Sequence, residues 1–360
     1  MTTPLEKERL VAVDVCRVLA AFAVICIHTE PFAPNRVASD SPLLNFLHEV
    51  ISLVCRFAVP FFFCTSGYFW GRKIRGGAPL WPTTRTMLSR LTAIFAFWFV
   101  AYFLPIDFAA IGSFGPSGLL KSYYWHFLKV VKHPVTILYG GDAVHLWFLP
   151  ALLCALTIAY FFVSKKRSGL LLGTALLLYV IGVLGGAYQG SEVGFSLHIG
   201  NNILNTRDGP FFGTLFFTTG YLLSARNPKR SWAALGLIIL TAGLVIHFSE
   251  FVLIQTCLHS KPVPVSSRDF AFGTYGMGVG AFLMAIANPR WLGSPLLARW
   301  GKVTLGIYCV HYYFVKQLTP VVEWLHNPVS ELLFPVVVFL LSLLAVWILM
   351  KNSFTQRFVQ

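Results

Sequence analysis

Charged residues are scarce in this chain of 360 residues: they make up only 12% of it, while 56% of the residues are hydrophobic. Soluble domains carry about 25% charged residues, so the composition excludes an ordinary soluble protein and indicates an integral membrane protein. Acidic residues are especially few, and the net charge is +14. The basic residues fall in short clusters between apolar segments, which is the pattern of membrane topology. We therefore expect no nucleic-acid partner.

Paired cysteines are also lacking. The seven cysteines form no C-x-x-C motif, and six of them lie in apolar runs. Scattered thiols of this kind are typical of small buried hydrophobic positions, not of a disulfide framework or a metal site. No spacing of His, Cys and Asp resembles a metal-ligand motif, so we predict no metal site and no bound cofactor. Without an internal repeat or a soluble stretch, residues 1–360 are interpreted as a single transmembrane domain.

Long apolar segments dominate what is present. Each is near the ~20 residues that cross a membrane. The segments are 11–30, 43–70, 86–106, 144–163, 169–188, 210–224, 232–253, 269–287, 302–320 and 332–350. Eighteen Lys and Arg residues fall on one side of these segments and seven on the other, alternating from loop to loop. This asymmetry predicts an all-α polytopic membrane protein with about ten transmembrane helices and both termini in the cytoplasm.

Two details refine this topology. The short segment 210–224 begins at Pro210, as expected for a proline in the first turn of a helix. The longest outer connection, about 107–143, contains Tyr123, Tyr124, Trp125 and His126. It is interpreted as an interfacial helix, as a lid over an outward-facing pocket or as an interface belt.

The first apolar segment carries Asp14, Arg17 and His28. Ionisable groups inside a membrane segment are costly and mark a functional site by default. Asp14 precedes Arg17 by three residues, so the two can pair on one face of the helix. The eleven residues from Arg17 to His28 leave them roughly 20° apart around the helix and about 16 Å apart along it. These groups also argue against a cleaved signal peptide.

The second segment holds Arg56 at mid-span and Ser66, Gly67 and Tyr68 toward its inner end. Pro60 predicts a kink, whose freed backbone groups must be satisfied by neighbours or by a cavity. Ser66-Gly67 allows another helix to approach closely, so packing explains much of this segment. Packing does not explain Arg56. We take Arg56, Ser66 and Tyr68 as candidates for binding a donor or an acceptor.

The connection after this segment is basic, with Arg72, Lys73, Arg75, Arg85 and Arg90. Clustered cations at the cytoplasmic face attract anionic lipid and equally the phosphates of a nucleotide-bearing donor. Positive-inside topology explains part of the pattern. Arg85 and Arg90 are the candidates for donor binding.

Two further motifs contain histidine. His145 and Trp147 open the fourth segment in His-Leu-Trp-Phe-Leu, and Tyr308 and His311 lie in Gly-Ile-Tyr-Cys-Val-His of the ninth. His311 lies ~15 Å from the inner end of its segment, near mid-membrane. His145 can equally be an interfacial residue, and His311 a hydrogen-bonded core histidine. All four residues are candidates for donor or acceptor binding.

Together, Arg-x10-His, Phe-Phe-Phe-Cys-Thr-Ser-Gly-Tyr, His-Leu-Trp-Phe-Leu and Gly-Ile-Tyr-x-x-His resemble the motifs of the bacterial membrane acyltransferase family 3, which O-acylates surface polysaccharides and related glycans. The resemblance implies a multi-pass protein of the bacterial cytoplasmic (inner) membrane. It also implies transfer of an acyl group, usually acetyl, from cytoplasmic acyl-CoA to a glycan or lipid-linked saccharide at the outer face. Arg17 and His28 match the family's essential pair. The chain departs from larger members in having no C-terminal esterase-like domain, which suggests a single-step transferase.

Acyl transfer to a hydroxyl needs a base, and His28 is the best candidate because imidazole titrates near neutrality. Asp14 would fix the Arg17 guanidinium, which can hold a donor phosphate or the carbonyl oxygen. The ~16 Å between Arg17 and His28 is comparable to an extended pantetheine arm.

Other functions fit part of the pattern. A secondary transporter also places charges at mid-membrane, but it is expected to have paired broken helices in two related halves, which we do not find. A non-catalytic module on the same scaffold would only bind a small molecule. An intramembrane acyltransferase of another class would centre on His311 and leave Arg17 unexplained.

Overall fold

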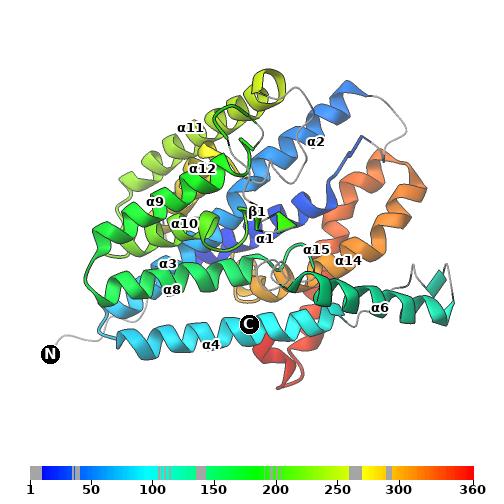
Figure 1. Ribbon diagram of the computed structural model, residues 1–360, viewed down its shortest axis with the longest axis horizontal. Helices are drawn as coiled ribbons and strands as arrows, with labels where there is room; N and C mark the ends of the chain where they lie inside the picture. The colour runs from blue at the N-terminus through cyan, green and yellow to red at the C-terminus, as the bar shows by residue number, and fades with distance from the viewer. Residues whose placement is uncertain are drawn as a thin grey trace.

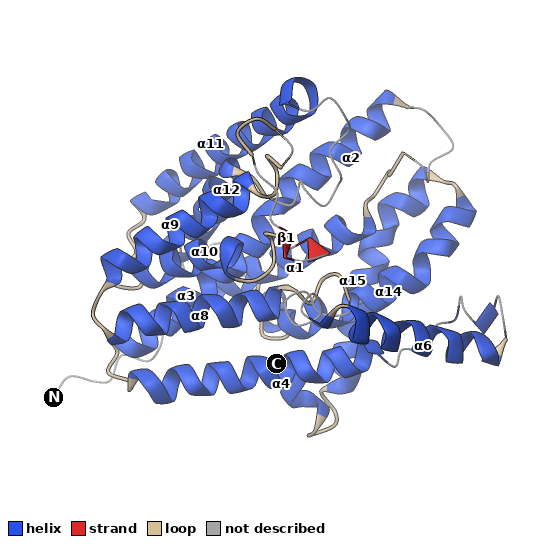
Figure 2. Cartoon of the chain, viewed as in Figure 1, coloured by secondary structure: helices blue, strands red, loops and turns tan. Residues whose placement is uncertain are grey.

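The protein is a bundle of α-helices in the computed structural model (Figure 2). The structure describes residues 10–34, 36, 41–103, 106, 108, 111–112, 115–134, 143–189, 191–194, 198–199, 202–203, 205–258, 270–288 and 294–360. Within these ranges the only strands are a two-residue antiparallel pair, β1 (His198–Ile199) and β2 (Asn202–Ile203). The prediction of a helical fold is confirmed.

Each of the ten predicted segments overlaps a helix. The first half of the chain contains α1 (Val11–Thr29), α2 (Pro42–Val54), the 3-10 turn η1 (Cys55–Phe57), α3 (Ala58–Arg75), α4 (Leu80–Phe103), α6 (Pro116–Lys132), α8 (Phe148–Ser164) and α9 (Ser168–Leu184). The second half contains α10 (Pro210–Leu223), α11 (Ser231–Leu253), the π turn η2 (Ile254–Leu258), α12 (Phe272–Ala287), α13 (Pro295–Trp300), α14 (Thr304–Leu325), α15 (Pro328–Leu349) and the 3-10 turn η4 (Thr355–Phe358). Pro210 is the first residue of α10, as predicted.

Five helical stretches in the described part of the chain are long and apolar enough to cross a membrane. They are Val11–Thr29, Pro42–Arg75, Leu80–Phe103, Ser231–Thr256 and Pro328–Leu349. Three more apolar helices, α8, α9 and α12, are shorter. These helices support a multi-pass membrane protein. Ten crossings and cytoplasmic termini stay predictions.

The second segment is interrupted before Pro60, where the sequence predicted a kink. The α-helix stops at Val54, passes through η1 and resumes at Ala58. Pro60 is the third residue of α3, where a backbone N–H has no intrahelical acceptor. A proline there costs the helix little, but it prevents regular α-helical bonding back into η1. The interruption therefore falls one turn earlier than predicted.

Helix α1 runs through the middle of the bundle and contacts α3, α12, α13, α14 and α15 (Figure 1). Most of its residues are buried. Because protein surrounds this helix, its polar side chains meet side chains from distant parts of the chain.

A buried ion pair holds the C-terminal end of α1. Glu331 in α15 is fully buried and lies 3.5 Å from the Arg36 guanidinium. Arg36 also donates to the carbonyls of Thr29 and Glu30, which end α1. The backbone N–H of Phe32 donates to Glu331 at 3.2 Å. These contacts fix the chain directly after His28.

Helices α3 and α10 pack backbone to backbone. A Cβ added to Gly67 would lie 2.0 Å from the carbonyl oxygen of Phe217, and one added to Gly220 would lie 1.9 Å from that of Cys64. The close approach predicted for Ser66-Gly67 is therefore present. Large buried aromatic side chains surround it, namely Phe61, Phe63, Phe216, Phe217 and Phe282.

Helix α6 projects away from the bundle near the end of α4 (Figure 1). It exposes Leu120, Tyr124, Trp125 and Phe127. Among the described residues, none from α6 lines the cavity described below. Part of the connection 107–143 lies outside the described residues, and its three interpretations stay predictions.

Candidate active site

Near the start of α1, the Arg17 side chain is held by two neighbours. Its Nη1 lies 3.3 Å from Oδ1 of Asp14, which is the contact expected from their three-residue spacing. Its guanidinium carbon lies 5.2 Å from the centroid of the Phe69 ring. A planar guanidinium stacked on a ring and paired with a carboxylate has a fixed orientation.

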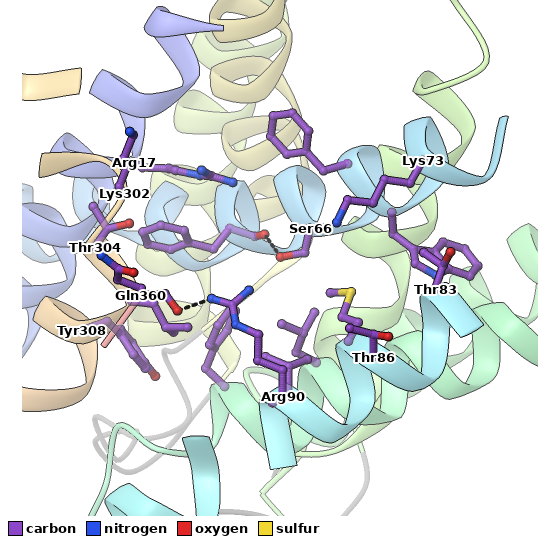
Figure 3. Close-up of a pocket in the computed structure, with 18 of the residues that line it drawn as sticks. Arg17, Ser66, Lys73, Thr83, Thr86, Arg90, Lys302, Thr304, Tyr308 and Gln360 are labelled. Carbon is purple, nitrogen blue, oxygen red and sulfur yellow. Dashed lines mark hydrogen bonds between the residues drawn. The ribbon is translucent and has the colours of Figure 1, made fainter. Parts of the chain in front are cut away.

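Arg17 opens onto a cavity of about 740 Å³, a volume typical of small-molecule sites. Four cationic side chains line it, from four parts of the chain: Arg17, Lys73, Arg90 and Lys302. No Asp or Glu stands among the described residues of its lining. In Figure 3, Arg17, Lys73 and Arg90 point toward the centre of the cavity from different helices. This arrangement suits an anionic ligand with several charges.

Hydroxyl groups and apolar surfaces complete the lining. The hydroxyls belong to Ser66, Thr83, Thr86, Thr304 and Tyr308. The Ser66 hydroxyl donates to the Phe62 carbonyl at 2.8 Å, and Arg90 donates to the backbone carbonyl of Gln360 (Figure 3). The cavity therefore combines cations with an extended apolar wall.

The structure separates the predicted donor-binding candidates. Ser66, Arg90 and Tyr308 line the cavity with Arg17. Arg85 is exposed on α4 and is not part of the lining, so the structure does not bring it together with Arg90 at this cavity. Tyr68 also lies outside the lining, because its ring packs between Phe69 and Phe282.

Sequence reasoning missed Lys302 as a site residue. It lies in the turn between α13 and α14. The positive-inside rule already accounts for the basic residues of this loop, so they gave no separate signal of a site. The threonines of the lining carried no motif either. Lys73 also lines the cavity, whereas the basic connection predicted donor binding only at Arg85 and Arg90.

At the other end of α1, three histidines meet. The His28 ring centroid lies 5.3 Å from that of His311 and 6.3 Å from that of His145, and the last two lie 5.0 Å apart. Tyr312 packs 5.5 Å from His28 and 5.2 Å from His145. His145 and His311 are fully buried. We call His28, His145 and His311 the histidine cluster.

Hydrogen bonds to backbone carbonyls fix one nitrogen of two of these rings. Nε2 of His145 lies 3.0 Å from the carbonyl oxygen of Cys309, and Nδ1 of His311 lies 2.6 Å from that of Tyr308. A carbonyl only accepts, so both of these nitrogens carry the proton. Within the described structure, Nδ1 of His145 and Nε2 of His311 are buried and have no hydrogen-bond partner. Nowhere in the described ranges are three His, Cys, Asp or Glu side chains arranged to hold a metal ion.

Tyr308 belongs to both sites. It lines the cavity, and its ring centroid lies 5.6 Å from that of His145 and 5.8 Å from that of His311. Its hydroxyl donates to the backbone carbonyl of His145. Tyr102 in α4 donates to the Cys309 carbonyl at 2.8 Å and so fixes the same turn of α14. The cationic cavity and the histidine cluster therefore share a wall.

Arg207 lies close to the segment that contains His145. The Arg207 guanidinium carbon lies 5.0 Å from the Trp147 ring centroid, and its Nε lies 3.2 Å from Oδ1 of Asp208. Trp147 follows His145 by two residues, and both Trp147 and Arg56 lie outside the cavity lining.

The fold and this two-part site define a multi-pass membrane protein whose central helix joins a cationic cavity to a histidine cluster. Comparison with protein families matches residues 10–351 to the acyltransferase domain. The chain therefore belongs to acyltransferase family 3, and its membership confirms the resemblance of the four motifs.

Comparison with curated proteins finds relatives that are named as racemases and not as acyltransferases. An amino-acid racemase of Enterococcus faecalis is 30% identical over 62% of this chain and 29% of its own length. A serine/alanine racemase of Enterococcus gallinarum is 27% identical over 84% of this chain and 40% of its own length. The chain thus spans well under half of these relatives. No solved structure matches the chain.

Proposed function

We propose that the protein transfers an acyl group, acetyl in the first instance, from cytoplasmic acyl-CoA to a hydroxyl group at the outer face of a bacterial inner membrane. A surface glycan or lipid-linked saccharide is the proposed acceptor. The observation that carries this proposal is the shared wall at Tyr308 between the cationic cavity and the histidine cluster. A donor bound in the cavity ends beside the groups that can handle a proton.

The cavity suits the donor. Phosphates of a nucleotide carry several negative charges, and the lining offers Arg17, Lys73, Arg90 and Lys302. Its apolar wall can accept a pantetheine arm directed toward Tyr308. Arg17 lies about 16 Å along α1 from His28, too far to contact a carbonyl oxygen reacting there. We therefore assign Arg17, fixed by Asp14, to donor binding.

The histidine cluster suits the chemistry. His28 removes the proton of the acceptor hydroxyl, and the oxygen then attacks the thioester carbonyl carbon. The tetrahedral intermediate collapses with cleavage of the carbon–sulfur bond. We assign stabilisation of the negative charge that develops in this step to Arg207, whose guanidinium lies against Trp147, two residues after His145.

The test uses purified protein in oriented vesicles with labelled acetyl-CoA and the cell's own lipid-linked glycans. We expect acyl-CoA to be consumed only from the cytoplasmic side, with acylated acceptor on the other. His28→Ala should remove at least 99% of turnover, since loss of a general base costs about 10²–10⁴-fold. His133→Ala, in an exposed position after α6, is the matched control and should keep wild-type turnover.

Two results would count against this function. An acceptor that crosses the membrane unmodified, with no CoA thiol released, identifies a transporter. A ligand that binds without thioester cleavage under any condition identifies a non-catalytic binding module.

A further inference from the structure

The histidine cluster contains more proton-accepting capacity than one general base needs. The bonds to the Cys309 and Tyr308 carbonyls leave His145 Nδ1 and His311 Nε2 as nitrogens with a lone pair. Both are buried and without a partner in the described structure. A buried polar atom left in this state is costly, and it points to a partner that arrives during function.

His311 occupies the position between the base and the donor cavity. Its ring lies 5.3 Å from that of His28 on one side and 5.8 Å from that of Tyr308, the cavity wall, on the other. Because Nε2 of His311 has no hydrogen bond to His28, a proton passes between these rings through one bridging water. His311 therefore lies on the shortest path from the acceptor proton to the donor.

We propose that His311 is a second proton-transferring residue, which protonates the departing thiolate. This inference rests on the proposed acyl transfer. The acceptor hydroxyl gives its proton to His28, and the acceptor oxygen forms a bond to the acyl carbon. The proton passes from His28 to Nε2 of His311. As the carbon–sulfur bond breaks, Nε2 gives that proton to sulfur, so that CoA leaves as the thiol and both imidazoles return to neutrality.

His145 is assigned a positioning role. Its ring is 6.3 Å from His28, farther than His311, and its backbone carbonyl accepts from the Tyr308 hydroxyl. It stacks on Tyr312 at an interplanar angle of 30°. These contacts hold the ring against α14 and keep His311 oriented.

The experiment compares two donors that differ in how much their sulfur needs a proton. Acetyl-CoA releases an alkyl thiol, whereas an S-aryl thioacetate releases an aromatic thiol of lower pKa that departs readily as the thiolate. His311→Asn is the test variant, because its amide can keep the hydrogen bond to the Tyr308 carbonyl while Nε2 is lost. We expect kcat with acetyl-CoA to fall about 100-fold with little change in KM. With the aryl donor the loss should shrink to less than tenfold.

His28→Asn is the comparison variant. It lacks the base that activates the acceptor, so its loss of kcat should be the same with both donors. His311→Gln provides a second substitution at the same place, and intact insertion is checked for each variant by elution as a single species in detergent. His247→Gln, in α11 and outside the cluster, should behave as wild type with both donors.

The outcomes separate the two proposals. If the wild-type protein transfers nothing from either donor, the acyl-transfer function fails and this inference fails with it. If the wild type is active and both His311 variants are normal, or lose equally with both donors, His311 delivers no proton to sulfur. If the donor-dependent loss appears in His145→Asn instead, the role belongs to His145.

Discussion

Replacing Gly67 with alanine tests the packing that supports one wall of the cavity. The added Cβ would lie 2.0 Å from the carbonyl oxygen of Phe217, whereas ordinary contacts begin at 3.4 Å. Helices α3 and α10 would have to separate by about 1.4 Å at this point, the difference between those distances. No side-chain rotation relieves the clash, because the opposing atom is backbone.

Two effects of opposite sign determine how much Gly67→Ala changes the free energy of unfolding. Overpacking costs about 1–3 kcal/mol, and a backbone clash belongs at the upper end of that range. Alanine regains about 1 kcal/mol of helix propensity over glycine. We therefore expect Gly67→Ala to lower the free energy of unfolding by about 2 kcal/mol. Because Ser66 and Phe69 line the cavity from the same helix, KM for acyl-CoA should also rise.

A thiol-reactive fluorophore measures the effect during heating of the detergent-purified protein. Cys64, Cys26 and Cys309 are buried free thiols that become reactive on unfolding. Gly173→Ala in α9 is the matched control, since its Cβ meets nothing within 4 Å. The control should unfold at the wild-type temperature or above it, and Gly67→Ala several degrees below. If both variants unfold together, the backbone contact of α3 with α10 is absent.

Three further substitutions test the site and its support. Arg17→Lys should lower kcat/KM at least tenfold in steady-state kinetics, because a point charge cannot reproduce the planar pairing with Asp14. A variant with the wild-type kcat/KM would show that Arg17 supplies only a positive charge. Lys302→Gln should raise KM for acyl-CoA severalfold with little loss of kcat, whereas Arg85→Gln, outside the cavity, should leave KM unchanged; equal effects would place the donor elsewhere. Glu331→Gln should lower the free energy of unfolding by about 3 kcal/mol, because it leaves the buried Arg36 without its counter-charge. Thermal unfolding measures this loss, and the exposed Glu323→Gln is the control.

Much of the fold could be predicted from local sequence because apolar length and helix signals are local properties. Each predicted segment overlaps a helix, and Pro210 begins α10. The break before Pro60 was placed one turn late, because a proline interrupts the bonding of the residues that precede it. The contact of Asp14 with Arg17 follows from helical spacing alone.

The site was predictable only where its residues share a helix. His28, His145 and His311 are more than 100 residues apart in sequence. The packing of α14 against α1 brings His28 and His311 together, and contacts of the turn before α8 with α14 add His145. Arg85 and Arg90 were grouped by charge. Five residues correspond to about 140° around a helix, so the two could not both face one cavity. Helical periodicity, applied to that connection, would have separated them.

The shared wall at Tyr308 also has a consequence for the insulation of the membrane. Tyr308 lines the cationic cavity and packs against His145, and Phe148, which also lines the cavity, packs on the Tyr308 ring. Its hydroxyl, bonded to the His145 carbonyl, keeps that ring in place. Under the proposed function, this protein joins a cytoplasmic donor to an acceptor on the other side, so it must also retain ions and protons. Tyr308 is therefore expected to act as a seal as well as a contact surface, and its removal should make proteoliposomes leak protons even in the absence of either substrate.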